Sequence, residues 1–135
     1  MASGLHGVNH IACLAKNIDE TVDFYKKYLD IPLKSIVNNT PGHMHIALDL
    51  GDGGTLDFFE AKPGTVAVER NTIGGLNHFA LTADPDYIDA MEQRLTGTAV
   101  HFRLDQRGGQ KTIYVTDPNG IEVQLYPSSG GSNKR

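Results

Sequence analysis

The hydrophobic pattern of the first half of the chain predicts a strand, a helix and three further strands. Residues 8–14 are apolar almost throughout, which is typical of a strand covered on both faces. Apolar side chains then return at helical spacing as far as Leu29, and Asn17 or Asp19 is expected to cap this helix. The three strands that follow are predicted at residues 33–37, 45–50 and 55–60.

The second half of the chain repeats this order of elements. A strand is predicted at residues 76–82, and Asp84-Pro85 indicates a helix start, with Asp as the cap and Pro at the first helical position. Gly97 is expected to end this helix. Three more strands are predicted at residues 99–104, 111–116 and 121–126.

The two halves begin with nearly the same hexapeptide. Gly7-Val8-Asn9-His10-Ile11-Ala12 returns as Gly75-Leu76-Asn77-His78-Phe79-Ala80, and four of the six positions are identical. An internal repeat of this kind indicates two copies of one supersecondary unit. We therefore predict a single domain at residues 1–127, built from module one at 7–62, a linker at 63–74 and module two at 75–127, and a flexible tail at 128–135.

Composition narrows the classes of function. The chain has 135 residues, one cysteine and a formal charge of −4, so nothing favours nucleic-acid binding. No apolar run approaches the ~18 residues of a membrane span, and the N-terminus lacks the features of a signal peptide. Cys13 stands alone in a strand pattern, which rules out an internal disulfide and fits a reducing cytoplasm. We expect a cytoplasmic protein that does not bind membranes.

The alternation of the closing strands assigns side chains to the two faces of each sheet. Leu56 and Phe58 are expected to meet the helix of module one, which sends Asp57 to the opposite face. Val123 is expected to meet the helix of module two, which sends Glu122 to the inner face of that sheet. We expect the two inner faces to line a shared cleft that collects His10, Asp57, His78 and Glu122. Two imidazoles and carboxylate oxygens that converge in this way suit a divalent transition metal.

These motifs resemble the vicinal oxygen chelate superfamily, which includes glyoxalase I, extradiol dioxygenases and bleomycin-resistance proteins. The resemblance covers residues 7–127 and rests on the two Asn-His strand starts, on Asp19-Glu20-Thr21-Val22-Asp23-Phe24-Tyr25, and on the segment from Tyr114 to Tyr126. It implies an α+β fold, in which two tandem βαβββ modules form a curled eight-stranded mixed sheet with helices on its outer face. It also implies a homodimer.

The resemblance implies that His10, His78 and Glu122 bind the metal. Asp57 departs from the pattern, because metal-binding members usually carry Glu or Gln at this position. It is therefore expected either as a fourth ligand or in contact with the ligands. Tyr114 stands where the ring-cleaving dioxygenases of the superfamily carry an active-site tyrosine, although the run from proline to glutamate is two residues shorter here.

Other candidate residues follow from the alternation of the strands. Thr112, Tyr114 and Thr116 are expected to face inward, and Tyr114 and His101 are the candidate acid–base groups. Arg103 is expected to point outward, which leaves no basic cluster for an acidic substrate. The candidate substrate-binding residues are His45, Phe59, Phe102, Gln124 and Tyr126.

The predicted ligand set leaves three functions open. With three protein ligands, the site resembles a two-histidine, one-carboxylate iron(II) oxygenase acting on a vicinally oxygenated aromatic small molecule. With Asp57 as a fourth ligand, it fits an isomerase or lyase of glyoxalase or epimerase type, for which nickel, cobalt, manganese or zinc are the alternative metals. The third reading is a metal-free protein that sequesters a small molecule. Iron(II) and the oxygenase are favoured.

Overall fold

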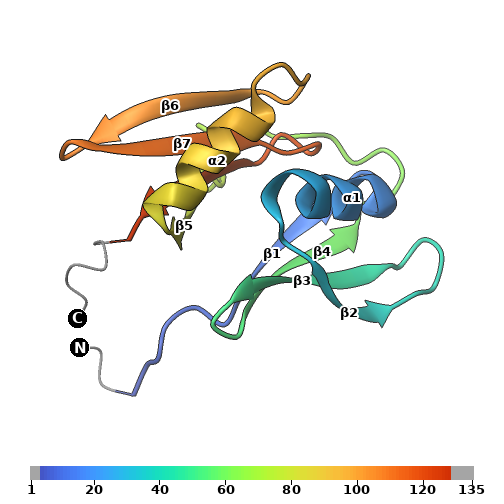
Figure 1. Ribbon diagram of the computed structural model, residues 1–135. Helices are drawn as coiled ribbons and strands as arrows, with labels where there is room; N and C mark the ends of the chain where they lie inside the picture. The colour runs from blue at the N-terminus through green and yellow to red at the C-terminus, as the bar shows by residue number, and fades with distance from the viewer. Residues whose placement is uncertain (1–3, 129–135) are drawn as a thin grey trace. The chain divides into compact units, whose positions relative to one another are not determined.

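The computed structural model describes residues 4–128, and the chain divides into two compact units, Met1–Thr65 and Val66–Arg135 (Figure 1). The elements of the first unit are β1 (His10–Ala15), α1 (Ile18–Leu29), β2 (Leu33–Asn38), β3 (His45–Gly51) and β4 (Gly54–Glu60). Those of the second are β5 (Phe79–Ala83), α2 (Pro85–Leu95), β6 (Phe102–Arg107), β7 (Gln110–Thr116) and β8 (Glu122–Pro127). The predicted flexible tail lies outside the described residues, apart from Ser128.

Each unit forms a four-stranded mixed sheet with the same topology. The strand order is β1-β4-β3-β2 in the first unit and β5-β8-β7-β6 in the second. The first strand of each unit pairs in parallel with the last, and the remaining pairs are antiparallel. The tandem βαβββ modules and the α+β class are therefore confirmed, with the eight strands divided between two hydrogen-bonded sheets.

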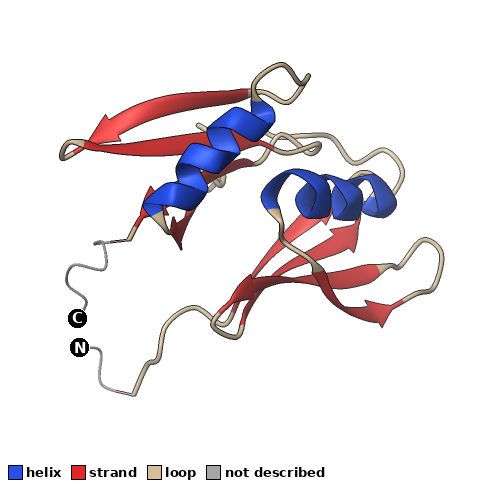
Figure 2. Ribbon diagram, viewed as in Figure 1, coloured by secondary structure: helices blue, strands red, loops and turns tan. Residues whose placement is uncertain are grey.

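Helix α1 covers one face of the first sheet (Figure 2). The side chain of Asn17 accepts a hydrogen bond from the backbone N–H of Glu20 at 2.9 Å, so Asn17 rather than Asp19 is the N-cap. The buried side of α1 includes Tyr25, whose ring centroid lies 5.7 Å from that of Phe58 on β4. Phe58 therefore faces the helix, as the alternation predicts, and Asp57 lies on the other face of the strand.

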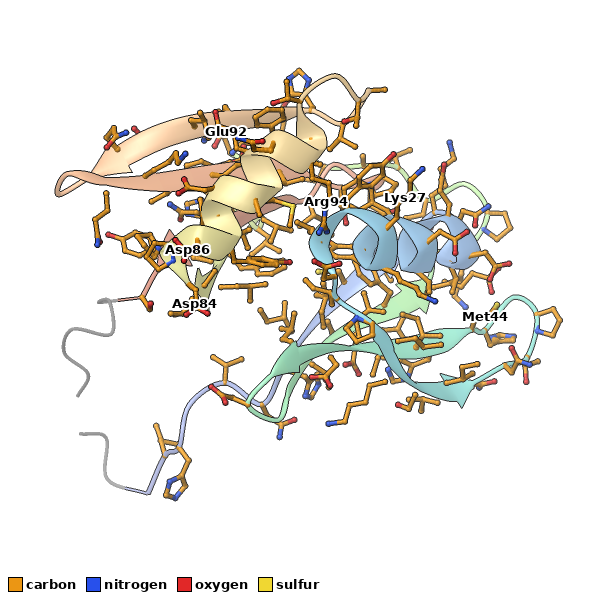
Figure 3. The ribbon with its side chains drawn as sticks, viewed as in Figure 1. Lys27, Met44, Asp84, Asp86, Glu92 and Arg94 are labelled. Atoms are coloured by element: carbon orange, nitrogen blue, oxygen red, sulfur yellow. The ribbon has the colours of Figure 1, made fainter. Side chains whose placement is uncertain are left out.

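Helix α2 covers one face of the second sheet and begins at Pro85, as predicted. An ion-pair cluster shows which face this is, because Lys111 on β7 contacts Glu92 of α2 at 2.6 Å. Figure 3 labels Glu92 on α2. Ile113 and Val115 follow Lys111 at alternate positions and are fully buried. Tyr114 between them therefore belongs to the face away from α2. Among the described residues, neither helix is long and apolar enough to cross a membrane.

Three strand predictions differ from the structure. β5 begins at Phe79 rather than at residue 76. β6 begins at Phe102 rather than at residue 99, because Thr98 directs its hydroxyl to the carbonyl of Leu95 at 2.7 Å and the chain turns there. β1 was expected to be covered on both faces, but Leu14 is 54% exposed, whereas Ala15 is buried. The strand thus alternates between a covered and an open face.

Candidate metal centre

His10 starts β1 on the open face of the first sheet. It is paired with Thr55 in the parallel register, while Ala12 is paired with Asp57. The imidazole Nδ1 of His10 lies 2.8 Å from the side-chain oxygen of Asn9. An amide oxygen can only accept, so the proton of the neutral ring sits on Nδ1 and the lone pair sits on Nε2.

His78 repeats this contact in the second unit. Its Nδ1 lies 2.6 Å from the side-chain oxygen of Asn77. The amide nitrogen of Asn77 donates to the side-chain oxygen of Asn71, which fixes which way the amide points. Metal-binding histidines commonly donate their second ring N–H to such a partner, which leaves the other nitrogen for the metal. The repeated Asn-His pair therefore leaves Nε2 of both imidazoles available.

Both carboxylate oxygens of Asp57 are engaged in hydrogen bonds. Thr55 donates its hydroxyl to Oδ1 at 2.7 Å, and Nε2 of His45 lies 2.8 Å from Oδ2. Burial alone would raise the pKa of Asp57, but the hydrogen bonds from Thr55 and His45 and the charges of His10 and His45 outweigh it, so the pKa lies below its usual value. Asp57 is therefore a carboxylate at neutral pH and is already well bound within its own unit.

His45 and Phe59 share this face with Asp57. Their rings stack with centroids 3.9 Å apart, and Phe59 also lines a pocket of about 410 Å³. The other residues that line this pocket are Leu14, Gly42, His43, Met44, Glu60, Lys62 and Thr65. The carboxylate of Glu60 accepts hydrogen bonds from the backbone N–H groups of Gly42 and Met44, in the loop before β3. The open face of the first unit thus offers an aromatic wall beside the Asp57 carboxylate.

Glu122 starts β8 and is buried, at 5% exposure. Its Oε1 is 3.0 Å from Nη1 of Arg70 and 3.3 Å from Nη2 of Arg103, and its Oε2 is 3.4 Å from Nε of Arg103. The prediction that Arg103 points outward is wrong. The register of β6 on β7 sets Arg103 opposite Tyr114 and Phe102 opposite Val115. Phe102 accordingly lies on the α2 face of the sheet, away from Glu122, which contradicts its expected role in substrate binding.

Three further candidates lie on the Glu122 face by strand register. Gln124 is paired with Tyr114, and Tyr126 follows Gln124 at the next alternate position. The Tyr114 ring is buried and meets the His78 ring edge-on, with centroids 5.4 Å apart. His101 directly precedes β6 and is exposed, and its backbone carbonyl accepts a hydrogen bond from Thr116.

Arg70 and Arg103 are the residues that sequence reasoning missed. A signal for Arg103 was present, since the two-residue turn Gly108-Gly109 sets the pairing of the strands on either side of it. Counting back from that turn places Arg103 opposite Tyr114. Arg70 belongs to the segment assigned as a linker, and nothing in the local pattern indicates its partner.

The donor set fits a divalent transition metal, because two imidazoles with available Nε2 atoms and a buried carboxylate are the ligand types that such ions prefer. Residues 4–128 contain no preformed group of three or more His, Cys, Asp or Glu side chains that could hold a metal. The expected ligands are divided between the units, with His10 in the first and His78 and Glu122 in the second.

The sequence matches the model of the Glyoxalase/Bleomycin resistance protein/Dioxygenase superfamily over residues 7–125. This match spans both modules and nearly the whole described chain. The chain therefore belongs to this superfamily, which confirms the resemblance drawn from its motifs.

Solved structures share the fold at low sequence identity. A glyoxylase/bleomycin resistance protein/dioxygenase domain from Frankia sp. EAN1pec aligns with a TM-score of 0.77 and 18% identity, over 90% of this chain and 97% of that one. Oxidase ChaP-H2 aligns with a TM-score of 0.70 and 17% identity, over 96% and 98%. A mutant fosfomycin resistance protein FosX from Listeria monocytogenes, complexed with Mn(II) and 1S,2S-dihydroxypropylphosphonic acid, aligns with a TM-score of 0.68 and 21% identity, over 93% of each chain.

Proposed function

We propose that this protein is a divalent-metal-dependent enzyme acting on a small molecule with two vicinal oxygens, and that His10, His78 and Glu122 bind the metal. Family membership supports a metal-dependent activity, and a fold neighbour is described with Mn(II) and a vicinal diol. The Asn contacts that leave Nε2 of both histidines available support the ligand assignment.

Within this class, we propose an iron(II) oxygenase that acts on a catecholic or other vicinally oxygenated aromatic. The observation that carries this choice is the state of Asp57, whose two oxygens already accept hydrogen bonds of 2.7 and 2.8 Å. The contacts of Glu122 are longer, at 3.0 to 3.4 Å, and come from arginines that are partly exposed. A metal would therefore displace the hydrogen-bond partners of Glu122 more readily than those of Asp57. Under this proposal the protein ligands are His10, His78 and Glu122, and Asp57 is not one of them.

The lowered pKa of Asp57 also counts against the isomerase reading. A general base works best when its pKa lies near the working pH, whereas Asp57 holds its proton less tightly than an ordinary carboxyl group. Asp57 is better suited to orienting His45 than to removing a proton from carbon. The alternative of a glyoxalase- or epimerase-type enzyme would need another base, for which His101 and Tyr114 are the candidates.

Several side chains have roles in this proposal. Iron(II), when bound, would supply Lewis acidity and open coordination positions for the substrate oxygens and O₂. Tyr114, held edge-on to His78, would donate or accept a proton at its hydroxyl, and His101 would exchange protons at the exposed end of β6. Phe59 and His45 would offer stacked rings to a planar substrate, and Gln124 and Tyr126 would offer polar groups from β8.

The test begins with protein purified without oxygen. Metal analysis should find iron, and an oxygen electrode should record O₂ uptake with members of a catechol panel. Nickel, cobalt or zinc without O₂ uptake would support the isomerase, and no metal at all would support a sequestering protein. Asp57→Glu sharpens the choice, because the longer side chain should reach the metal, occupy an open position and suppress O₂ uptake. Retained or improved turnover in this variant would contradict the oxygenase.

A further inference from the structure

Two arginines share one carboxylate on the open face of the second sheet. Arg70 and Arg103 both approach Oε1 of Glu122, at 3.0 and 3.3 Å. Two guanidinium groups against one carboxylate leave this cluster with a formal charge of +1. The cluster therefore presents an excess of positive charge.

The Arg103 side chain is held in place and remains accessible. Its guanidinium carbon lies 3.8 Å from the centre of the Tyr114 ring, and the side chain is 52% exposed. Stacking on an aromatic ring restricts the guanidinium plane and leaves its edge N–H groups directed outward. The contacts of Arg103 with Glu122, at 3.3 and 3.4 Å, are longer than the ~2.8 Å of a strong charge-assisted hydrogen bond. N–H groups of Arg103 are therefore available to bind a second anion.

Arg70 complements this arrangement from the loop before β5. Its side chain is 36% exposed, and its Nη1 also lies 3.4 Å from the backbone carbonyl of Asn77, next to His78. The two guanidiniums therefore approach the same carboxylate from different parts of the unit. A cation bound to Glu122 would compete with both of them for that carboxylate, which would leave more of their N–H groups for another partner.

We infer that Arg70 and Arg103 form a binding site for an anionic group, and that the substrate carries a carboxylate in addition to its two vicinal oxygens. A carboxylate is favoured because it matches the planar, two-donor edge of a guanidinium. The anion site itself stands on the contacts within the second unit. Its assignment to the substrate rests on the proposed function, because Glu122 is the proposed metal ligand.

The first experiment measures binding to the metal-loaded protein by anaerobic calorimetry. Catechol and 3,4-dihydroxybenzoate serve as probes that differ only in the carboxylate. We expect the acid to bind at least about tenfold more tightly, in line with a charge-assisted hydrogen bond. Arg103→Gln and Arg70→Gln should each reduce this preference. Arg94→Gln, which removes the same charge from α2, should retain it. Equal binding of both probes, or a preference that survives the loss of both arginines, would overturn the inference.

A second experiment does not depend on the metal. In metal-free Glu122→Gln the competing carboxylate is gone, so benzoate should bind about tenfold more tightly than to the metal-free wild type. Adding Arg103→Gln should cancel the gain. Failure to gain affinity would refute the anion site, and a gain for inorganic phosphate alone would refute the choice of a carboxylate. If benzoate binds as expected while the wild type retains no metal, the proposed function fails and the anion site stands.

Discussion

At the scale of single residues, the two Asn-His pairs make the most direct prediction. Asn9→Ala and Asn77→Ala should each release the neighbouring imidazole, so that its proton can move to Nε2. Loss of such a supporting contact typically costs 10- to 100-fold in metal affinity. Nitrogen-detected NMR of the metal-free protein should show the Nδ1–H tautomer for His10 and His78, and a shift toward Nε2–H in the matching variant only.

The other histidine of each variant serves as the internal control. Asn9→Ala should leave His78 unchanged, and Asn77→Ala should leave His10 unchanged. If the wild type already carries its protons on Nε2, the histidines are not prepared for the metal as proposed. Asn71→Ala should shift the His78 tautomer toward Nε2–H less than Asn77→Ala does, because it removes only the contact that orients the Asn77 amide.

A second prediction at this scale concerns the pH dependence of Asp57. Its pKa in the folded protein is lower than the ordinary aspartate value of 3.8, so its ionised form stabilises the fold. This contribution is fully present above about pH 4 and is lost as the pH falls through the lower pKa of the folded state. Urea unfolding should therefore separate the wild type from Asp57→Ala by roughly 1–3 kcal/mol at pH 7.

The gap between the two unfolding free energies should narrow as the pH falls well below 3.8, where the wild-type carboxyl is also protonated. Asp52→Asn offers a control for charge removal, because Asp52 is an exposed residue of the β3–β4 turn and Asn tolerates its φ of 50°. A difference between wild type and Asp57→Ala that is constant from pH 7 to acid would show that the Asp57 charge does not stabilise the fold.

At the scale of elements, the two helix starts differ in a way that can be measured. Asn17 caps α1 through its side chain, whereas the side chain of Asp84 makes no cap hydrogen bond to α2. Asn17→Ala should therefore lower the free energy of unfolding by about 1 kcal/mol. Asp84→Ala should lower it by no more than about half as much, through the helix dipole alone. Chemical denaturation of both variants checks this, and an equal loss would contradict it.

The sequence predicted the elements well where a local signal defined their ends. The Asp-Pro start of α2 and the hydrophobic stripe of α1 are examples, and so is the face of β4 that sends Phe58 to the helix. The start of β6 has no such local signal, because it depends on the hydrogen bond that Thr98 makes. The hydrophobic pattern of β6 alone predicts the wrong faces for Phe102 and Arg103, because the turn between β6 and β7 sets the register.

At the scale of the whole molecule, the repeat predicted more than any single motif. Because Asn9-His10 and Asn77-His78 recur at equivalent strand starts, the repeat predicted two copies of one supersecondary unit, and the structure shows the same sheet topology and the same Asn–His contact in each. The sequence does not predict which residues contact Glu122. Arg70 lies far from Glu122 in sequence and in a segment without periodicity, so its ion pair exists only through the path of the loop.

The last prediction is that the protein forms a homodimer. Each four-stranded sheet has two edge strands, which are β1 and β2 in the first unit and β5 and β6 in the second. β2 is exposed along its whole length, including Ile36 at 53% and Val37 at 59%. An edge that combines unpaired backbone groups with apolar side chains favours association. Sedimentation velocity at micromolar concentration should therefore give the mass of a dimer. Ile36→Lys should shift the distribution toward monomer if β2 is the contact, whereas Val66→Lys, at an exposed loop position, should not. A wild-type monomer at that concentration would contradict the prediction.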